Sequence, residues 1–287
     1  MIKLGIIGAE NSHSYCIGKV CNIDKKVPMR TTHIWGETRE AASNAADKAK
    51  IPNIVDDWRE MLGLVDGVMI NQRHGAHHFE SAEFFIKNGV PTFVDKPMTT
   101  DLNEAKVVFK LAGQKKTPVC TFSLIPLQQA FRKFARNLAT KGTIQALNTS
   151  GPVDLDSPYG GIFFYGFHQI DAMVEIMGTE AKSVSFQRNG QNGVATILFS
   201  GNRMATMNCI ANDGIFHWRV CTDKGVFVLP HQYDKDIYLA STKAIHRLIA
   251  KGEVPWNESR MLAPIAILEA LQKSLDSGSV QLVHELA

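Results

Sequence analysis

The first 122 residues alternate short apolar runs with longer stretches in which apolar residues recur at helical spacing. The apolar runs predict buried strands at 3–8, 30–35, 66–71, 92–95 and 117–122. The stretches between them predict helices at 12–22, 37–50, 58–64 and 77–88 and one that begins near residue 101. Strands that alternate with helices are typical of a parallel sheet with helices on both faces. The pattern therefore predicts an α/β fold whose N-terminal domain, residues 1–122, is a doubly wound Rossmann-like sheet.

The pattern changes over residues 123–287. Helical spacing predicts helices at 128–140, 163–177, 241–250 and 258–274, and a strand begins near Ile144. Between Ser183 and Leu229, apolar runs are separated by turn signals at Asn189-Gly190, Asn192-Gly193, Gly201-Asn202, Asp213-Gly214 and Lys224-Gly225. These features predict an α+β domain with an open antiparallel sheet. They leave open whether the C-terminal helix packs back on the first domain.

Composition narrows the class of protein. The net charge is +3 and no basic tract carries interleaved aromatic residues, so nucleic acid is not an expected partner. No apolar run approaches the roughly 20 residues of a membrane span, and the sequence begins directly with a strand. The five cysteines are scattered without a close pair, which is typical of reduced thiols. We expect a soluble, cytoplasmic protein.

The loop after the first strand stands where a dinucleotide fingerprint would be. Gly8 can serve as the first glycine, but Glu10 and His13 occupy the positions of the second and third. The following helix still offers free amides that, with Ser12, could hold a phosphate. Taken alone, the loop fits a dinucleotide site and a plain strand-to-helix turn equally well.

The end of the second strand bears on the choice of cofactor. Glu37 is a candidate to accept hydrogen bonds from ribose hydroxyls, whereas Thr38 and Arg39 could receive a 2′-phosphate. A solvated helix cap explains the same residues. The cofactor is therefore left open between NAD and NADP.

Two residues are candidates for proton transfer. Lys96 follows the apolar run 92–94 and precedes Pro97; a lysine desolvated at a strand end can exchange protons with a substrate hydroxyl, and a cis Lys96-Pro97 bond is expected. His168 lies in the predicted helix 163–177, downstream of Gly160-Gly161, where a ligand could approach the backbone. A surface lysine and a structural histidine are the alternative interpretations.

Read together, these segments resemble the Gfo/Idh/MocA family, the glucose–fructose oxidoreductase and inositol dehydrogenase group. The resemblance covers almost the whole chain. It rests on Gly5-Ile6-Ile7-Gly8, on the strand, loop and helix over 69–89, on Asp95-Lys96-Pro97, on Gly160-Gly161, and on the helix that contains Gly166-Phe167-His168-Gln169-Ile170-Asp171. The lysine–proline signature and the downstream glycine–histidine–aspartate helix are fairly specific as a pair.

The resemblance implies an NAD(P)-dependent oxidoreductase that transfers a hydride between nicotinamide and a carbinol of a sugar, cyclitol or similar polyhydroxylated small molecule. It implies that Lys96 binds the reacting hydroxyl and that His168 is the acid/base group. It also implies a homodimer or homotetramer assembled through the open sheet. The positions carried over as cofactor contacts are Gly8, Ala9, Asn11, Ser12, His13, Glu37, Thr38, Arg39, Asn71, His77, Asp95 and Pro97.

Departures from the family pattern support two other hypotheses. Phe164 stands where family members often carry an aspartate four residues before the histidine, which leaves Tyr165 or Asp171 to orient His168. With Glu10 and His13, this departure favours a non-catalytic nucleotide- or sugar-binding sensor. The third hypothesis is a metal-dependent lyase or isomerase with ligands drawn from Glu10, His13, His74, His77, His78, Asp95 and His168. No metal is assigned on the sequence alone.

Overall fold

The computed structural model describes residues 1–230 and 233–286, which form two compact units. The first unit comprises Met1–Phe122 and Asp236–Asn257, and the second comprises Ser123–Lys235 and Glu258–Ala287. The sequence assigned 1–122 and 123–287 to separate domains; the structure instead groups 236–257 with the first unit. Each unit is therefore built from two separate stretches of chain.

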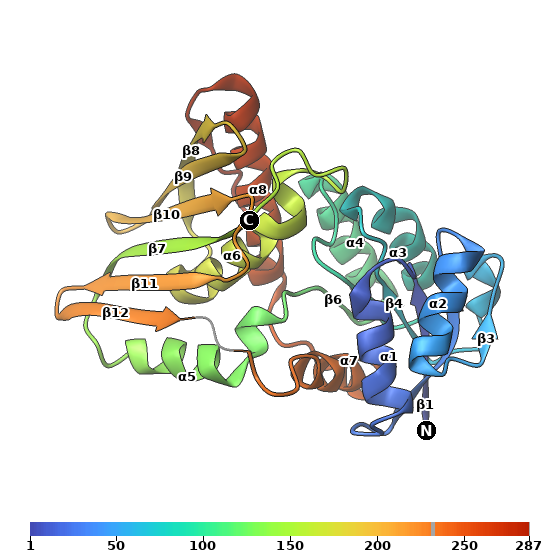
Figure 1. The fold of residues 1–287 in the computed structure, drawn as a ribbon. Helices are drawn as coiled ribbons and strands as arrows, with labels where there is room; N and C mark the ends of the chain where they lie inside the picture. The colour runs from blue at the N-terminus through green and yellow to red at the C-terminus, as the bar shows by residue number, and fades with distance from the viewer. Residues whose placement is uncertain (231–232, 287) are drawn as a thin grey trace. The chain divides into compact units, whose positions relative to one another are not determined.

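A six-stranded, wholly parallel sheet forms the centre of the first unit (Figure 1). Its spatial order is β3-β2-β1-β4-β5-β6. The strands are β1 (Ile2–Ile7), β2 (Met29–Trp35), β3 (Asn53–Ile54), β4 (Gly67–Ile70), β5 (Thr92–Val94) and β6 (Val119–Cys120). The chain order reverses beside β1, which pairs with both β2 and β4, so the predicted doubly wound sheet is confirmed.

Helices of the first unit pack in pairs, α1 on α2 and α3 on α4. The helices are α1 (Ser12–Asn22), α2 (Arg39–Ala49), α3 (His78–Lys87), α4 (Leu102–Lys115) and α7 (Leu239–Lys251), with 3-10 turns η1 (Trp58–Met61) and η2 (Gly75–His77). The helix expected at 58–64 is only the turn η1. Asp57 and Glu60 form a capping box that starts it, and Gly63 follows with a left-handed φ of 80°.

A seven-stranded sheet forms the second unit, in the order β12-β11-β7-β10-β9-β8-β13. The strands are β7 (Ile144–Pro152), β8 (Ala181–Asn189), β9 (Asn192–Phe199), β10 (Arg203–Ile210), β11 (His217–Thr222), β12 (Gly225–Pro230) and β13 (Gln281–Leu282). All neighbours are antiparallel except β7 and β10, which run parallel. The predicted open sheet is confirmed, but it is mixed because β7 lies between β10 and β11.

Only some of the predicted turns join strands that pair with each other. Asn189-Gly190, Gly201-Asn202 and Lys224-Gly225 join paired strands, as predicted. Asp213-Gly214 joins β10 to β11, which do not pair. Asn192-Gly193 lies within β9, where a Cβ on Gly193 would come within 2.5 Å of the Phe186 ring. The hairpin turns predicted at Asp213-Gly214 and Asn192-Gly193 were therefore wrong.

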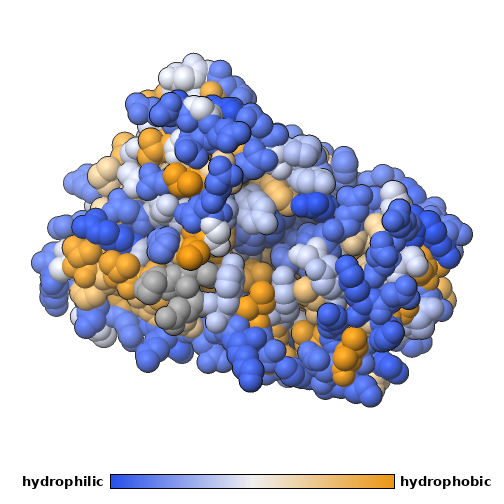
Figure 2. Space-filling view, in the orientation of Figure 1, coloured by the Kyte–Doolittle hydropathy of each residue, from blue (hydrophilic) through white to orange (hydrophobic). Residues whose placement is uncertain are grey.

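Helices cover one face of the second sheet. α6 (Ile162–Met177) packs on β7, α8 (Glu258–Ser277) packs on β8, and the two helices pack on each other. The remaining helical elements are η3 (Ile125–Leu127) and α5 (Gln129–Leu138). Apolar side chains that stay exposed on the sheet include Leu198, Met204, Val226 and Val228. Figure 2 shows hydrophobic residues gathered near its β11–β12 edge.

In the described part of the chain, no helix has the length and apolar character needed to cross a membrane.

Candidate functional site

The loop that follows β1 requires glycine at its first position. Gly8 has a φ of 103°, and a Cβ there would lie 2.3 Å from the backbone nitrogen of Gln72. Its own nitrogen donates to the carbonyl of Trp35 at 3.0 Å, and its carbonyl accepts from Oγ of Ser14 at 2.5 Å. The loop therefore lies tightly against the carboxyl ends of β2 and β4.

Asp95 gathers the polar side chains at this edge of the sheet. Its carboxylate accepts from Nδ2 of Asn11 at 3.1 Å and from Nδ1 of His13 at 3.0 Å. A carboxylate only accepts, so the Asn71 amide is oriented with its nitrogen toward Asp95, at 3.0 Å from Oδ2. Three predicted cofactor residues are thus brought together around a fourth. His13, which replaces a fingerprint glycine, is bound to Asp95.

The charge of Asp95 is maintained despite its burial. Burial alone would raise the pKa of the carboxyl, but the charge and hydrogen bond of His13, assisted by Lys96, hold it below the usual range. Asn11 also caps α1, because its side chain accepts from the backbone nitrogen of His13 at 3.1 Å. One first-turn amide of α1 is therefore already satisfied.

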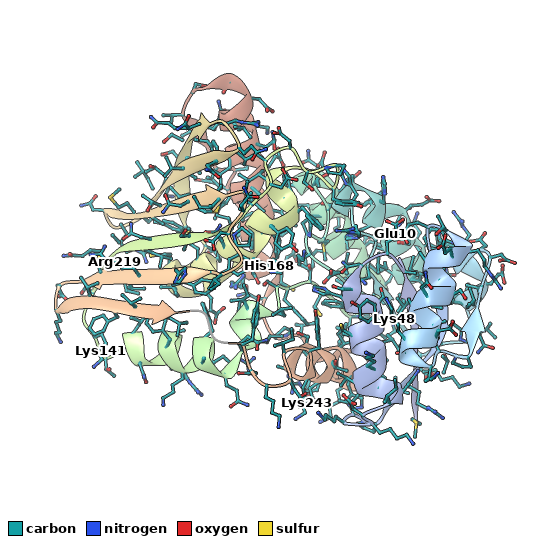
Figure 3. All side chains as sticks on the ribbon, viewed as in Figure 1. Glu10, Lys48, Lys141, His168, Arg219 and Lys243 are labelled. Atoms are coloured by element: carbon teal, nitrogen blue, oxygen red, sulfur yellow. The ribbon has the colours of Figure 1, made fainter. Side chains whose placement is uncertain are left out.

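Glu37, at the end of β2, binds the same loop. Its Oε2 accepts from the backbone nitrogens of Ala9 at 3.0 Å and Glu10 at 3.2 Å. Its Oε1 is buried and has no hydrogen-bond partner in the described residues. Burial raises the pKa of Glu37, and the nearby Glu10 charge adds to the shift. The side chain of Glu10 itself is exposed (Figure 3).

Thr38 and Arg39, which follow Glu37, form hydrogen bonds away from the loop after β1. Thr38 caps α2 by accepting from the nitrogen of Ala41 at 3.1 Å. Arg39 forms an exposed ion pair with Asp56 at 2.8 Å. A cavity of about 260 Å³ opens here, lined by Trp35, Gly36, Glu37, Thr38, Arg39, Ala42, Val55 and Asp56.

Lys96 is buried, with 6% of its surface exposed, directly after β5. Burial lowers the pKa of its ammonium, Asp95 opposes this shift, and Arg73 adds to it. The Lys96-Pro97 bond is cis, as predicted. The buried His78 supports this segment: Nδ1 lies 2.9 Å from the carbonyl oxygen of Pro97, and Nε2 lies 2.8 Å from that of Gln72. The sequence indicated His78 only as a metal ligand.

Other predicted residues of the first unit do not join this group. The ring of His77 stacks on that of His74, with centroids 5.1 Å apart, and His77 is exposed. Ser12 is also exposed and hydrogen-bonds Tyr238. Within residues 1–230 and 233–286, no three histidine, cysteine or acidic side chains are grouped to hold a metal ion. The metal hypothesis therefore finds no ligand set among these residues.

In the second unit, His168 lies on α6 (Figure 3) and is 7% exposed. Its Nδ1 is 2.6 Å from Oγ of Ser123. The backbone nitrogen of Ser123 donates to Oδ2 of Asp171 at 2.9 Å, and Arg260 on α8 donates to Oδ1 of Asp171 at 2.6 Å. The expected orienting candidates were Tyr165 and Asp171. The Ser123 hydroxyl meets the imidazole, and Asp171 accepts from the backbone nitrogen of Ser123.

Aromatic side chains surround His168. The ring centroids of Tyr165 and Phe216 lie 6.0 Å and 5.7 Å from that of the imidazole. Phe164, in the position of the missing aspartate, packs against Tyr165 at 4.9 Å and Tyr159 at 5.1 Å. This position therefore contributes packing rather than a charge.

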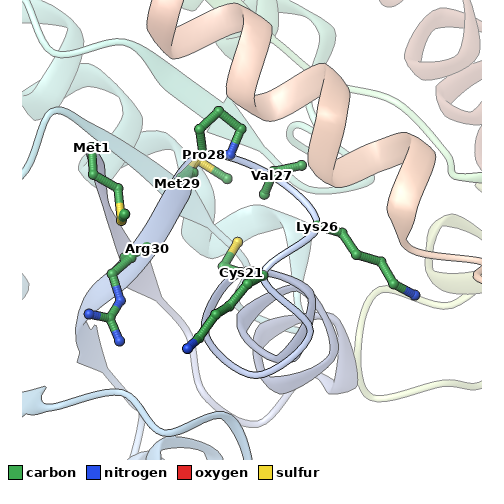
Figure 4. Close-up of a pocket in the computed structure, with 8 residues that line it drawn as sticks. Met1, Cys21, Lys26, Val27, Pro28, Met29 and Arg30 are labelled. Atoms are coloured by element: carbon green, nitrogen blue, oxygen red, sulfur yellow. The ribbon is translucent and has the colours of Figure 1, made fainter.

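A further cavity lies at the opposite end of the first sheet. Figure 4 shows its lining beside the amino ends of β1 and β2. Its volume is about 400 Å³, and its lining residues are Met1, Cys21, Lys25, Lys26, Val27, Pro28, Met29 and Arg30. Because ligands of open α/β sheets bind at the carboxyl ends of the strands, this cavity is not part of the candidate site.

Comparisons with known proteins agree with this geometry. Residues 2–122 match the profile of a family described as "Oxidoreductase family, NAD-binding Rossmann fold", GFO_IDH_MocA. A Salmonella typhimurium protein named as an oxidoreductase, YceM, is 26% identical over 159 residues, which are 53% of this chain and 49% of that protein. The chain thus spans about half the length of that curated relative.

Solved structures share the fold over nearly the whole chain. A scyllo-inositol dehydrogenase from Lactobacillus casei, solved with NAD(H) and scyllo-inositol, superposes with a TM-score of 0.83 at 15% identity, covering 99% of both chains. A myo-inositol dehydrogenase from Corynebacterium glutamicum superposes with a TM-score of 0.80 at 13% identity, again covering 99% of both chains. At these identities the likeness establishes the fold.

Proposed function

We propose that this chain, whose residues 2–122 match the Gfo/Idh/MocA oxidoreductase family, transfers a hydride between NAD and a carbinol of a cyclitol, sugar or related polyhydroxylated small molecule. The observation that carries the proposal is the buried Lys96 beside the Asp95 cluster, at the carboxyl ends of the parallel strands. A lysine whose pKa is lowered by burial can be neutral and accept a proton from a hydroxyl.

The residues at the strand ends fit a dinucleotide. Oε1 of Glu37 and Oε1 of Gln72 are buried acceptors without partners in the described residues, and ribose hydroxyls are donors that could satisfy them. The cavity after β2 has room for part of an adenosine. Bound NAD would supply the nicotinamide that takes up or releases the hydride. Gly8 would let the backbone approach the cofactor, and Pro97 would shape the nicotinamide pocket.

The same residues favour NAD over NADP. A 2′-phosphate beside Glu37 would meet a carboxylate, and Arg39 already pairs with Asp56. We therefore assign the Glu37 carboxylate to the ribose hydroxyls of NAD.

Aromatic rings around His168 support a ring-shaped polyhydroxylated substrate. Tyr165, with 40% of its surface exposed, offers both an apolar face and a hydroxyl. Such a side chain can contact the C–H face of a cyclitol or sugar while hydrogen-bonding its hydroxyls.

The experiment that tests this function is a titration with NADH and with NADPH, followed by nicotinamide fluorescence and thermal shift. We expect saturable binding of NADH, weaker binding of NADPH, and turnover of at least one member of a cyclitol and sugar panel with NAD. Folded, nucleotide-free protein that binds neither cofactor would contradict the proposal.

A sensor function has one specific observation in its favour. The amides of Ala9 and Glu10 are bound by Glu37, and that of His13 is bound by Asn11, so side chains already occupy donors that a pyrophosphate would use. A cofactor or sugar that stabilises the protein without any redox turnover of the panel would select this function.

We also propose that the protein is a cytoplasmic homo-oligomer. Leu198, Met204, Cys221 and Val226 lie in one continuous row of paired residues across β9, β10, β7, β11 and β12, with Ala146 between them. Three of these apolar side chains are at least 42% exposed, which supports a subunit contact on this face. All five cysteines are unpaired, which supports a reducing compartment. Light scattering of the purified protein tests the assembly.

A further inference from the structure

We propose that Ser123 is a positioning residue that fixes the tautomer of His168. In this arrangement the neutral imidazole carries its hydrogen on Nε2 and acts on the substrate oxygen as a hydrogen-bond donor rather than as a base. The inference rests on the proposed oxidoreductase function and assigns proton transfer to Lys96 and not to His168. Because Phe164 stands in place of an aspartate, the partner of the histidine is a hydroxyl that donates, not a carboxylate that accepts.

The hydrogen-bond partners of the Ser123 hydroxyl determine which ring nitrogen of His168 carries the hydrogen. In the described part of the chain, Oγ has two hydrogen-bonding neighbours, the backbone nitrogen of Ile125 at 3.2 Å and Nδ1 of His168 at 2.6 Å. The backbone N–H can only donate, so it occupies an acceptor site on Oγ. The hydroxyl hydrogen then has one acceptor, Nδ1. A neutral imidazole that accepts at Nδ1 must carry its hydrogen on Nε2.

Because Ser123 is buried, the other tautomer, with its hydrogen on Nδ1, would cost free energy. Ser123 is 0% exposed, so water cannot replace the acceptor that its hydroxyl would lose if the ring took a hydrogen on Nδ1. A carboxylate has the opposite preference, because it only accepts and therefore favours a hydrogen on Nδ1. With Phe164 in the usual aspartate position, the partner of the histidine is a donor in place of an acceptor.

A network of hydrogen bonds through Asp171 and Arg260 fixes the position of Ser123. Its nitrogen donates to Asp171, whose carboxylate and carbonyl accept from Arg260 at 2.6 Å and 2.7 Å. Arg260 also reaches Oε2 of Glu175 at 3.2 Å. These charge-assisted hydrogen bonds connect the backbone of Ser123 to α6 and α8. The hydroxyl therefore meets the imidazole in one fixed direction.

The proton balance of the reaction follows from this tautomer. During oxidation, the hydroxyl proton of the substrate passes to the neutral amine of Lys96. Bound NAD would supply the acceptor for the carbinol hydride, which leaves with its electron pair so that a carbonyl group remains. Because Nε2 of His168 already carries a hydrogen in this tautomer, His168 takes up no proton during oxidation. In reduction, the Lys96 ammonium returns the proton.

The direct test is nitrogen NMR of the holoprotein labelled at its 10 histidines, because the two tautomers have distinct ring-nitrogen shifts. His168→Gln identifies the signal. We expect the Nε2–H form in the native protein, a mixture of tautomers in Ser123→Ala, and the native form again in Ser123→Thr. Ser241→Ala is the matched control, because it removes a buried hydroxyl that has no hydrogen-bond partner among the described residues. An Nδ1–H form in the native protein, or no change in Ser123→Ala, overturns the proposal.

Turnover provides a second test. We expect Ser123→Ala to lower kcat roughly fivefold with little change in KM, since a lost hydrogen bond of about 1 kcal/mol corresponds to such a factor. His168→Gln, which keeps an N–H donor, should retain more activity than His168→Ala. Equal loss in the two variants would overturn the donor role.

The NMR measurement requires no substrate and therefore separates the two proposals. The expected tautomer without turnover of any substrate would reject the oxidoreductase function and leave the Ser123–His168 assignment supported. Turnover with the opposite tautomer would reject the assignment alone.

Discussion

Nδ1 of His13 lies 3.0 Å from Oδ2 of Asp95, so the residue in place of a fingerprint glycine is bound to the residue before the candidate catalytic lysine. The pair joins the loop after β1 to the end of β5. With Asn11 and Asn71 on the same carboxylate, it makes the loop after β1 part of the structure around Lys96.

Asp95→Asn should destabilise the protein by about 1–3 kcal/mol at pH 7, because it removes the buried carboxylate that accepts from Asn11, His13 and Asn71. The folded pKa of Asp95 is depressed, so its stabilisation is present above the unfolded value of about 3.9 and is lost as pH falls through the folded pKa. Urea unfolding at several pH values should show the difference between native protein and variant shrinking toward acid. Asp47→Asn, on the exposed side of α2, should be near neutral. A pH-independent difference would contradict this account.

Lys96→Ala should lower kcat by roughly 10²- to 10⁴-fold while leaving the Kd for NADH within a few-fold. The rate of oxidation should rise with pH through the pKa of Lys96, which burial places below that of an exposed lysine. Steady-state kinetics and fluorescence titration measure the two effects. The exposed Lys110→Ala is the control. Unchanged turnover in Lys96→Ala would exclude the proposed role.

Glu37→Ala should weaken NADH binding by about tenfold, because one good hydrogen bond to a charged group is worth about 1.5 kcal/mol or more. The same change should narrow the difference between NADH and NADPH, since the repulsion of a 2′-phosphate is removed. Isothermal titration calorimetry with both cofactors measures this. Glu40→Ala, an exposed change in the first turn of α2, should leave both affinities unchanged. An unaltered preference in Glu37→Ala would disprove the assignment.

Arg260→Leu should cost about 3–5 kcal/mol of stability, because it leaves the Asp171 carboxylate buried and unpaired. Adding Asp171→Asn should recover part of the loss, since the uncompensated charge is removed. Denaturant unfolding of both single variants and the double variant forms the cycle. The exposed Arg136→Leu should be nearly neutral. Additive losses would show that the two side chains do not interact.

Local pattern was sufficient to predict most elements of the first sheet. α1 begins and ends at the predicted residues, 12–22, because the apolar spacing and the capping residue Asn11 are both encoded within one short segment. The strands predicted at 30–35 and 92–95 correspond to β2 and β5, because each is a local apolar run. Their carboxyl ends lie at one edge, which is why Glu37, Asp95 and Lys96 could be selected as candidates.

The contacts that were missed join residues far apart in sequence. Ser123 and His168 are 45 positions apart, and Asp171 and Arg260 are 89 apart, so no local spacing signals either pair. Likewise, the position of β7 between β10 and β11 follows from pairing across the chain. The missing aspartate at Phe164 was the only sequence signal that His168 required another partner.

The pairing of Asp171 with Arg260 also affects how the protein is made. The six strands of the first sheet have all been synthesised by Cys120, so that sheet can assemble while the rest of the chain is still being translated. Asp171 must wait for another 89 residues, including the 236–257 segment of the first unit, before its arginine leaves the ribosome. Until then, α6 carries an unneutralised carboxylate on a largely apolar helix. Translation that stops short of α8 would release a chain with a formed first sheet and an unfinished second unit, a natural substrate for chaperones and proteases.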